Sequence, residues 1–532
     1  MKYPGKFSPT IGIIIILSLL GSLMIFYSTY WGPWAYSDSA GYLAAARNLL
    51  HGHGLGYFGA SGDFMPLSIH PPFYSLVLSG MGLFGLDVIV AARWLNIILF
   101  GATIFLSGTF AYSTFHSSWL ALSLSASLLT MPSFVDVSSG AMSELLFFFT
   151  AILGICLLIV YLDQGKRYLL ILSSLAIGLA FLCRINGVVV VVAGIIGLMV
   201  INRISWKQRI IDTLVFSLIS LTPILSWLIW VYSQTKTIAA RDFFFTPHIW
   251  SATSELRRNI MEVFWSWLPF PQLLPPYSYH LSRNVFILLF AILFLSVLLI
   301  VIKQFISRKS IFSSPQEFGF ALLWIIFILG NILLLAASFI FIDLVPSTDS
   351  RTFFYIQFGL IIALLALFSA LIKVFRFPPA IGWICASVFL IFDLSYSLTS
   401  WNIINQYHLH GAGYTSEAWQ KSLTLKTLRA LPPDVPIITN QAAAVLLLLD
   451  RPAYDFCTLP CNQTGQFTYG DDPTDPVQGI FREDGAALVL FYGYCDFESY
   501  PWYANIIAEV KSLTQNLKIS FSSCDGKIFF YP

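Results

Sequence analysis

Charged residues are scarce in this chain, and their scarcity excludes most soluble folds. Only 11% of the 532 residues are charged and 57% are hydrophobic, whereas a soluble protein carries about 25% charged residues. The formal net charge of +2 is too small to indicate a nucleic-acid partner. Cysteine is rare too, with seven residues. No histidine lies among the cysteines of the polar C-terminal part, which argues against a zinc site there.

Long apolar runs, by contrast, recur from Ile11 to about Leu398. Each is long enough to cross a hydrocarbon layer of ~30 Å as a helix that satisfies its own backbone. The pattern predicts a polytopic α-helical membrane protein with about eleven transmembrane helices. We place these near 11–30, 88–112, 118–136, 141–161, 168–184, 186–202, 210–232, 285–306, 317–342, 352–372 and 380–398.

Basic residues predict the orientation of the helices, because lysine and arginine collect in cytoplasmic loops. Lys2 and Lys6 precede the first span and predict a cytoplasmic N-terminus, and with eleven spans the other short basic turns fall on the same side. Residues 1–400 then form a transmembrane domain with outer loops at 31–87, 234–284 and 343–351. Residues 401–532 form an extracytoplasmic domain.

The C-terminal residues alternate between strand-like and helix-like patterns. Strands are predicted at 437–439, 487–492 and 519–521, and helices at 441–449 and 503–516. This alternation indicates a small α/β domain. Its cysteines, Cys457, Cys461, Cys495 and Cys524, suit two disulfides if the domain is extracytoplasmic, or else are reduced buried thiols. Within the second loop, residues 254–268 read as a helix that lies either on the membrane or against other helices.

Asp38 emerges just beyond the first span, in Tyr36-Ser37-Asp38-Ser39. A carboxylate there is suited to act as a general base. The spacing alone favours a helix N-cap at Ser37 or Asp38, and the two roles can coexist on neighbouring residues. His70 stands before the paired Pro71 and Pro72 at the next membrane boundary. It either binds a phosphate or substrate hydroxyl, or is a hydrogen-bonded structural residue.

Glu144 and Arg184 are ionisable groups at the predicted outer ends of apolar helices. Glu144 either stabilises a helix N-terminus through the helix dipole or serves as a second active-site carboxylate. Arg184 requires a partner or water there. The candidate partners are Asp136, Glu144 and an anionic lipid headgroup.

Arg351 lies in the third loop, where an outer arginine runs against the charge bias of membrane proteins. A guanidinium matches a phosphate with two parallel hydrogen bonds. A local ion pair with Asp349 is the alternative interpretation.

Together these segments resemble the C-type glycosyltransferases, in the branch of protein O-mannosyltransferases and bacterial aminoarabinose transferases. Asp38, Tyr42, the Ala-Ala-Ala-Arg-Asn-Leu-Leu stretch, His51-Gly52-His53-Gly54 and His70-Pro71-Pro72-Phe73-Tyr74 resemble the first-loop signature of that group. Ser143-Glu144, Cys183-Arg184 and Asp349-Ser350-Arg351 fall where the group has similar residues. The resemblance covers about residues 10 to 375.

The resemblance implies an inverting transfer of a sugar from a polyprenyl-phosphate carrier to an acceptor outside the membrane. Asp38 then matches the base, and His70, Arg351, Arg184, Glu144 and Tyr42 would bind the substrate or its phosphate. His70 stands where aminoarabinose transferases have a lysine, and Arg351-Thr352 where the family has Arg-Tyr. Asp38-Ser39-Ala40 lacks the Asp-x-Asp of metal-dependent relatives, so no metal or other cofactor is expected.

The expected partners are membrane lipid, the lipid-linked donor and an unidentified lipid, glycan or protein acceptor. A bacterial or archaeal plasma membrane is the expected location. Two other classes stay open: a transporter or lipid flippase, and a non-catalytic membrane scaffold. Transporters place ionisable groups and broken helices near the bilayer midplane, often in repeated halves. Here the charges gather at the predicted outer ends, which favours the enzyme.

Overall fold

The computed structural model of the chain describes residues 8–201, 205–237, 258, 260–270, 280–281, 283–285, 287–288, 315–341, 350–378, 380–455, 485–492 and 517–530. The chain divides into two compact units. The helical unit comprises Met1–Tyr30, Ser68–Tyr74 and Ala92–Leu409. The mixed unit comprises Trp31–Leu67, Ser75–Ala91 and His410–Pro532. Most of the predicted first loop, 31–87, therefore groups with the C-terminal residues.

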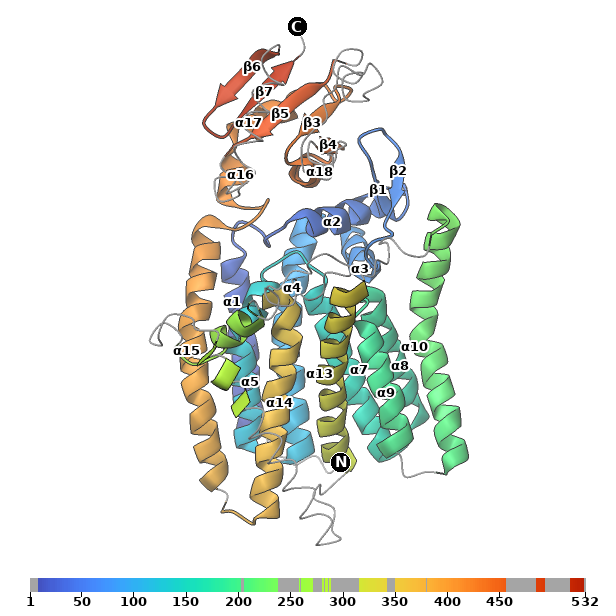
Figure 1. Ribbon diagram of the computed structural model, residues 1–532, viewed down its shortest axis with the longest axis vertical. Helices are drawn as coiled ribbons and strands as arrows, with labels where there is room; N and C mark the ends of the chain where they lie inside the picture. Colours follow the sequence, from blue (N-terminus) through green and yellow to red (C-terminus); the bar gives the residue numbers. More distant parts are fainter. Residues whose placement is uncertain are drawn as a thin grey trace. The chain divides into compact units, whose positions relative to one another are not determined.

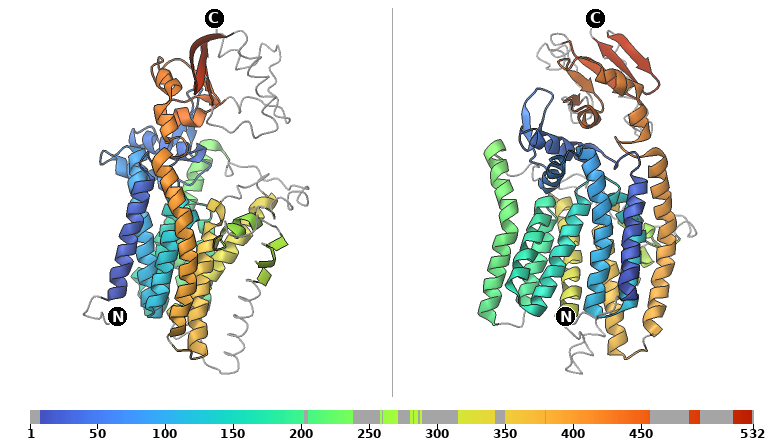
Figure 2. Two further views of the ribbon diagram at one scale, coloured as in Figure 1. Left: turned by 90° about the vertical axis from the view of Figure 1, so that its left-hand side faces the viewer. Right: turned by 180° about the vertical axis from the view of Figure 1, so that it is seen from behind.

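Long apolar helices form the helical unit as a bundle (Figures 1 and 2). Among the described residues, seven are long and apolar enough to cross a membrane, which makes the chain an integral multi-pass membrane protein. They are α1 (Pro9–Ser28), α4 (Val88–Phe115), α7 (Glu144–Gln164), α10 (Trp206–Thr235), α13 (Pro315–Phe341), α14 (Ser350–Val374) and α15 (Ala380–His410).

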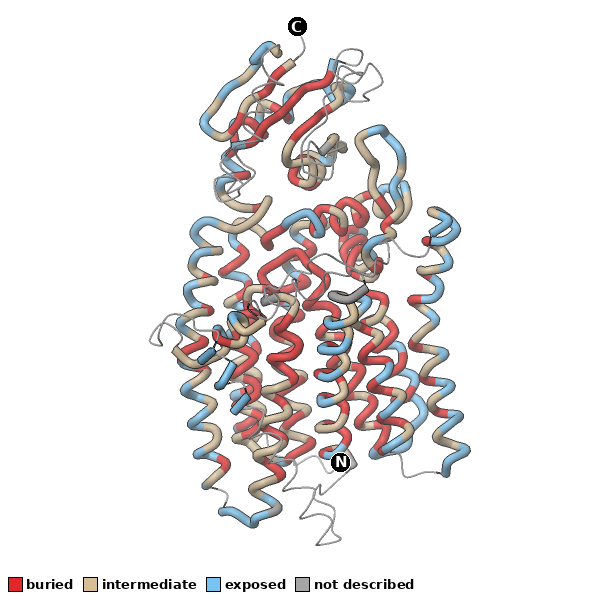
Figure 3. The backbone as a smooth tube through the Cα atoms, viewed as in Figure 1, coloured by how far each residue is buried: buried red, intermediate tan, exposed pale blue. Residues whose placement is uncertain are grey.

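Burial separates central from peripheral helices in this bundle (Figure 3). In the most apolar stretch of α7, 78% of the residues are buried, whereas in that of α15 only 22% are buried. The α7 helix packs through rings: Phe148 contacts Phe354 and Phe358 of α14 edge-on, at 5.3 and 4.6 Å between centroids. The exposed apolar side chains of α15, such as Leu390 and Leu398, suit contact with lipid.

Four of the eleven predicted spans are not single long helices among the described residues. The spans predicted at 168–184 and 186–202 are the shorter helices α8 (Arg167–Cys183) and α9 (Gly187–Ile201). Most of 285–306 lies outside the described residues. The span predicted at 118–136 consists of two helices, α5 (Ser118–Thr130) and α6 (Pro132–Ser138), bent by 57°. The count of eleven stays a prediction.

Pro132 explains why one continuous helix over 118–136 was the wrong expectation. A proline disfavours the helical conformation of the residue before it and cannot donate a backbone hydrogen bond. Met131 accordingly has extended backbone angles, with φ −64° and ψ 112°, and Pro132 begins α6 at its first position. The break is stabilised by Ser400, whose Oγ donates to the Thr130 carbonyl at 2.7 Å.

Helix α15 also runs further than the predicted 380–398, because it ends at His410. Its last turns are polar, so hydropathy alone ends the span too early. These turns are held by tertiary contacts: the Tyr407 hydroxyl donates to Asp136 Oδ1 at 2.6 Å, and a ring nitrogen of His408 lies 3.0 Å from the Tyr27 carbonyl.

The second-loop helix predicted at 254–268 is described at residues 258 and 260–268, and residues 260–266 are helical. Its side chains pack on the bundle. Ile260, Val263 and Trp267 lie against the buried cluster of Ile328, Phe353 and Ile356. Of the two interpretations, the described part therefore fits a helix that packs against other helices.

The mixed unit contains a five-stranded sheet with strand order β4-β3-β5-β7-β6. The strands are β3 (Ile437–Thr439), β4 (Tyr454–Asp455), β5 (Ala487–Phe491), β6 (Lys518–Ser523) and β7 (Gly526–Phe530). β3 pairs in parallel with β4 and β5, while β7 pairs antiparallel with β5 and β6. β3, β5, β6 and α18 (Ala442–Leu449) lie where elements were predicted, and residues 503–516 lie outside the described residues.

Short helices cover this sheet, and the rest of the unit comes from the chain before α4. Helices α16 (Glu417–Lys421) and α17 (Leu423–Arg429) contribute Trp419 and Leu428 to a core with β5. Residues 31–91 add α2 (Ser37–Leu50), the hairpin β1 (Gly56–Phe58) and β2 (Phe64–Pro66), and α3 (Phe73–Gly82), whose last eight residues belong to the unit. Cys524 is exposed at the β6–β7 turn, and the other three C-terminal cysteines lie outside the described residues.

Asp525 in the same turn supports a prediction about acid stability. Its carboxylate accepts hydrogen bonds from Ser422 Oγ at 2.5 Å, Thr424 Oγ1 at 3.0 Å, the Thr424 N–H at 3.3 Å and Ser523 Oγ. Partial burial acts to raise the pKa of Asp525, but these hydrogen bonds outweigh it and lower the pKa. Because the folded pKa lies below the unfolded one, ionised Asp525 stabilises the unit above about pH 4, and this stabilisation is lost as the pH falls further.

Asp525→Ala should therefore reduce the stability of the sheet at pH 7 by about 1 to 2 kcal/mol, and the difference from wild type should shrink below pH 4. Hydrogen exchange of the β7 amides, measured at pH 7 and again below pH 4, tests both expectations. Asp434→Ala, in the turn before β3, is the control. Equal exchange in Asp525→Ala and wild type at pH 7 would contradict the assigned role.

Candidate functional site

The predicted site residues are divided between the units. Asp38 and Tyr42 belong to the mixed unit, and His70, Glu144, Arg184 and Arg351 belong to the helical unit.

Asp38 lies in the first turn of α2 and is exposed. The N-cap residue is Tyr36, which has extended backbone angles and whose N–H donates to Ser39 Oγ at 3.2 Å. Neither Ser37 nor Asp38 is the cap, so the capping interpretation of Asp38 was wrong. The positive end of the helix dipole favours the ionised carboxylate. An exposed carboxylate at a helix start is accessible to a substrate, as a general base must be.

Tyr42 lies one turn further along α2, with only 2% of its surface exposed. Its carbonyl accepts a hydrogen bond from Ser75 Oγ at 2.9 Å, which joins α2 to α3. The Ala44-Ala45-Ala46 stretch is fully buried, because alanine lets a helix approach its neighbours closely. Burial indicates that Tyr42 packs inside the protein, so its role in substrate binding stays a prediction.

His70 is half-buried and lies in the turn before α3. Pro71 and Pro72 follow it directly and are buried, so they restrict the backbone on which the imidazole stands. Its role in phosphate binding stays a prediction.

Glu144 and Arg184 form an ion pair in the helical unit. Arg184 Nη1 lies 2.9 Å from Glu144 Oε1 and donates to Ser143 Oγ at 3.1 Å. The Glu144 side chain is 3% exposed and that of Arg184 is 29% exposed. Cys183 Sγ donates to the Ser143 carbonyl at 3.3 Å, which fixes the end of α8 against the start of α7. Of the three candidate partners of Arg184, Glu144 is therefore confirmed.

The pair depends on helix ends that meet. Glu144 is the first residue of α7, and Arg184 is the C-cap of α8, with extended backbone at φ −149°. The chain then turns back at once, since Gly187 begins α9. Arg184 thus binds Glu144 while 29% of its side chain stays exposed to solvent.

Gly187 at this turn supports a prediction. A Cβ on Gly187 would lie 2.3 Å from the Phe181 Cα and 2.6 Å from its nitrogen, which are backbone atoms that cannot move aside easily. Gly187→Ala should therefore shift the turn that carries Arg184 and destabilise the bundle by about 1 to 3 kcal/mol. Thermal unfolding in detergent measures this. Gly80→Ala, whose Cβ would meet nothing within 4 Å, should be neutral or slightly stabilising; an equal loss in both variants would contradict the steric account.

Arg351 lies in the first turn of α14 and is half-buried. Its predicted alternative partner, Asp349, lies outside the described residues. Near the same ends of two helices, Phe147 of α7 meets Tyr355 of α14 edge-on at 5.3 Å. Glu144 and Arg351 therefore lie in the first turns of two helices that start at the same end of the helical unit, where helix N-termini add positive partial charge.

A buried chain of hydrogen-bonded polar groups in this unit was not predicted from the sequence. Ser133 Oγ donates to Gln357 Oε1 at 2.8 Å, and Gln357 Nε2 donates to the Tyr396 hydroxyl at 3.2 Å. That hydroxyl donates in turn to the Trp267 carbonyl at 2.6 Å. An amide inside an apolar run is itself a signal, and Gln357 in the span after Arg351 was the residue that could have revealed it.

The fold and these charged helix ends define a class: an integral membrane protein that gathers arginines and helix N-termini at one end of its bundle. Sequence comparison agrees with the resemblance, since residues 69–230 match the family model described as dolichyl-phosphate-mannose-protein mannosyltransferase. A search of curated proteins found no match.

Solved structures extend this likeness over nearly the whole chain. The chain is similar to ArnT from Cupriavidus metallidurans bound to undecaprenyl phosphate, at 13% identity and a TM-score of 0.52, covering 97% of this chain and 98% of that chain. It is also similar to the apo oligosaccharyltransferase of Archaeoglobus fulgidus, at 11% identity and a TM-score of 0.52, covering 90% and 69%. The chain is similar as well to the mycobacterial arabinofuranosyltransferase AftD, at 12% identity and a TM-score of 0.51. That match covers 98% of this chain and 41% of that chain. The resemblance to C-type glycosyltransferases is confirmed.

Proposed function

We propose that the protein is an inverting glycosyltransferase that moves a sugar from a polyprenyl-phosphate donor to an acceptor on the outer face of the membrane. The observation that carries the proposal is the set of charged helix ends in the helical unit, where Arg184 and Arg351 lie at one end of a bundle. The fold is similar to that of ArnT from Cupriavidus metallidurans, whose structure holds undecaprenyl phosphate.

The proposed chemistry follows from the charges. The acceptor hydroxyl or amine attacks the anomeric carbon of the donor and gives its proton to Asp38. The bond between the anomeric carbon and the phosphate oxygen breaks, and the polyprenyl phosphate leaves with the electron pair. Arg184 and Arg351, with His70, stabilise the charge that grows on this phosphate. One displacement inverts the anomeric centre.

The N-terminus is cytoplasmic, and the mixed unit, with its C-terminal α/β sheet, faces the outside of a bacterial or archaeal plasma membrane. The donor anchors in the bilayer, so the acceptor must come to the membrane surface as a lipid, a glycan or a protein. Activity should survive EDTA, because the proposed phosphate binding uses only arginine and histidine.

A transfer assay with the purified full-length protein in lipid vesicles tests the proposal. Radiolabelled undecaprenyl-phosphate hexoses and pentoses are offered as donors, with membrane extracts as the source of acceptor. We expect label to leave the donor in the presence of extract, with and without EDTA. Labelled donor that moves across the vesicle bilayer with its sugar still attached would instead indicate a flippase. The absence of both transfer and movement would indicate a scaffold.

A further inference from the structure

Helix α2, which carries Asp38, is held at both ends by residues from the C-terminal part of the chain. All of these contacts lie inside the mixed unit. They join residues 31–47 to residues 410–450, which are almost 400 positions later in the sequence. The first group precedes the N-terminus of α2, and the second surrounds Arg47 near its C-terminus.

The segment before α2 is bound through its backbone carbonyls. The bonds run from Tyr414 N–H to Ala35 O at 2.8 Å, from Thr415 Oγ1 to Pro33 O at 2.7 Å, and from Gln420 Nε2 to Trp31 O at 2.7 Å. Ala35 and Gly413 also form a parallel β-bridge. Ala35 stands three residues before Asp38, so these bonds fix the point from which α2 starts.

Gly413 shows how close this approach is. Its φ is +59°, which favours glycine, and a Cβ there would lie 2.2 Å from the Ala35 carbonyl oxygen. The chain must therefore have glycine at 413 for the two segments to meet.

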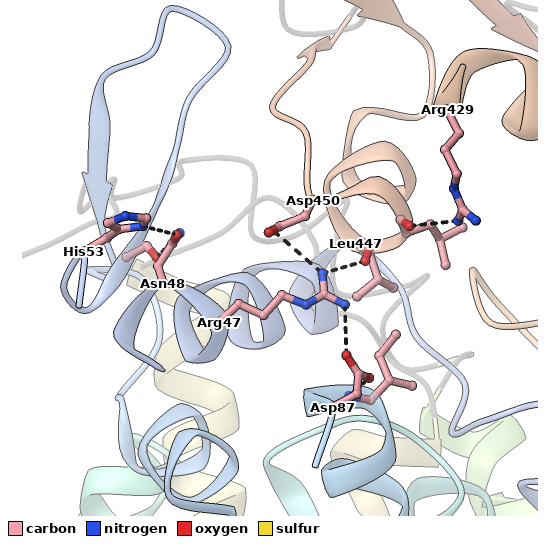
Figure 4. A network of polar contacts seen from close by, with 10 residues as sticks. Arg47, Asn48, His53, Asp87, Arg429, Leu447 and Asp450 are labelled. Carbon is pink, nitrogen blue, oxygen red and sulfur yellow. Dashed lines mark hydrogen bonds and ion pairs between the residues drawn. The ribbon is translucent and has the colours of Figure 1, made fainter. Parts of the chain in front are cut away.

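Arg47 holds the other end of α2 (Figure 4). Its Nη1 donates to the Leu447 carbonyl of α18 at 2.7 Å and lies 3.8 Å from Asp450 Oδ1. Its Nη2 lies 4.0 Å from Asp87 Oδ2, and the other oxygen of Asp87 accepts from the Ile89 N–H at the start of α4. The Arg47 side chain is only 15% exposed, whereas those of Asp87 and Asp450 are 55% and 51% exposed.

The short hydrogen bond at Leu447 is the strongest of these contacts. Leu447 lies in the last turn of α18, where carbonyls lack helical partners and the helix dipole is negative. A mostly buried guanidinium in that position makes a charge-assisted hydrogen bond. The two carboxylates are near the limit of ion-pair distance and largely exposed, so they contribute less.

We propose that residues 413–420 and 447–450 form a clamp that sets the position of the Asp38 carboxylate, with Arg47 and Thr415 as positioning residues. This proposal rests on the proposed function, in which Asp38 is the base. A helix of 14 residues is a stiff rod, so releasing one end tilts the other. A misplacement of about 1 Å at a reacting group can cost roughly a hundredfold in rate.

The clamp gives the C-terminal sheet a part in the reaction without placing any of its residues at the reacting atoms. Loosening it should lower kcat, because the base is misplaced in the transition state. The KM for the donor should change little, since the proposed phosphate-binding residues belong to the helical unit. A general loss of folding would instead affect both units.

Arg47→Ala tests the C-terminal end of α2, and Arg429→Ala is its matched control. Arg429 donates to the neighbouring Leu448 carbonyl at 3.4 Å from within the C-terminal part (Figure 4). Arg429 therefore contacts the same end of α18 as Arg47 does, but it lies on α17 rather than on α2. Thr415→Val tests the N-terminal end independently, because it keeps the side-chain shape and removes the hydroxyl that binds Pro33.

The measurements are hydrogen exchange of the α2 amides and steady-state transfer, both on the full-length protein in nanodiscs. Arg47→Ala and Thr415→Val should each speed exchange across residues 37–50 by about tenfold or more, and should lower kcat roughly tenfold to a hundredfold. Arg429→Ala should leave both near wild type.

Unchanged exchange of α2 in both Arg47→Ala and Thr415→Val would overturn the clamp, and faster exchange with unchanged kcat would overturn its effect on Asp38. If Arg47→Ala does not fold, Thr415→Val decides alone. If wild type transfers none of the sugars, the proposed function fails, and with it the positioning role; the exchange comparison still decides whether the contacts hold α2.

Discussion

Asp38→Asn should abolish transfer while leaving the protein folded. The amide has the size and shape of the carboxylate but cannot take up the proton of the attacking hydroxyl or amine. General-base catalysis is worth about 10² to 10⁴ in rate. Because Asp38 is exposed in the first turn of α2, the substitution should change thermal stability little. The measurement is kcat with the labelled lipid-linked donor, beside a melting curve.

Ser37→Ala is the matched control for this variant. Ser37 is the exposed neighbour of Asp38 in the same helical turn, and its removal should keep most of the turnover. Asp38→Asn with near wild-type kcat would remove the base from the proposed mechanism, whatever the donor proves to be.

Arg184→Ala should have the largest effect on stability. It leaves the Glu144 carboxylate, which is 3% exposed, without the partner 2.9 Å away. Removing one member of a buried ion pair costs about 3 to 5 kcal/mol, so the melting temperature should fall clearly. Thermal unfolding of the full-length protein in detergent measures the change.

A second variant separates the structural role of Arg184 from its proposed binding role. Arg184→Ala combined with Glu144→Gln removes the unpaired charge, so most of the lost stability should return. Transfer should stay low if Arg184 also binds the donor phosphate. Arg184→Ala that melts like wild type would contradict the ion pair, and a stable, fully active double variant would limit Arg184 to a structural role.

The sequence predicted the membrane helices well where a single apolar run decides the structure. Helices such as α4, α7 and α10 lie within a few residues of their predicted ranges, because about twenty apolar residues in a row have few other stable structures. It was wrong where local chemistry breaks a run or tertiary contacts extend one. Pro132 divides the predicted span at 118–136, and the polar end of α15 stays helical through contacts that hydropathy cannot express.

The candidate site shows the same division. Arg184 at a helix end demanded a partner, and the sequence named Glu144 among three candidates; only coordinates could choose. It could not reveal that Arg47 binds Leu447, because nothing local marks a contact between residues 400 positions apart. The buried chain through Gln357 was also missed, since its other members are single polar residues inside apolar helices.

The proposed function requires a base and several fixed cations around the headgroup of a polyprenyl-phosphate donor. A cryo-EM map of the full-length protein with bound undecaprenyl phosphate tests it most directly. We expect a phosphate oxygen within about 3 Å of the guanidinium of Arg184 or Arg351, with the Asp38 carboxylate facing the phosphate across the space that the sugar would occupy. A phosphate bound away from both arginines, or an Asp38 side chain turned away from the phosphate, would contradict the proposed function.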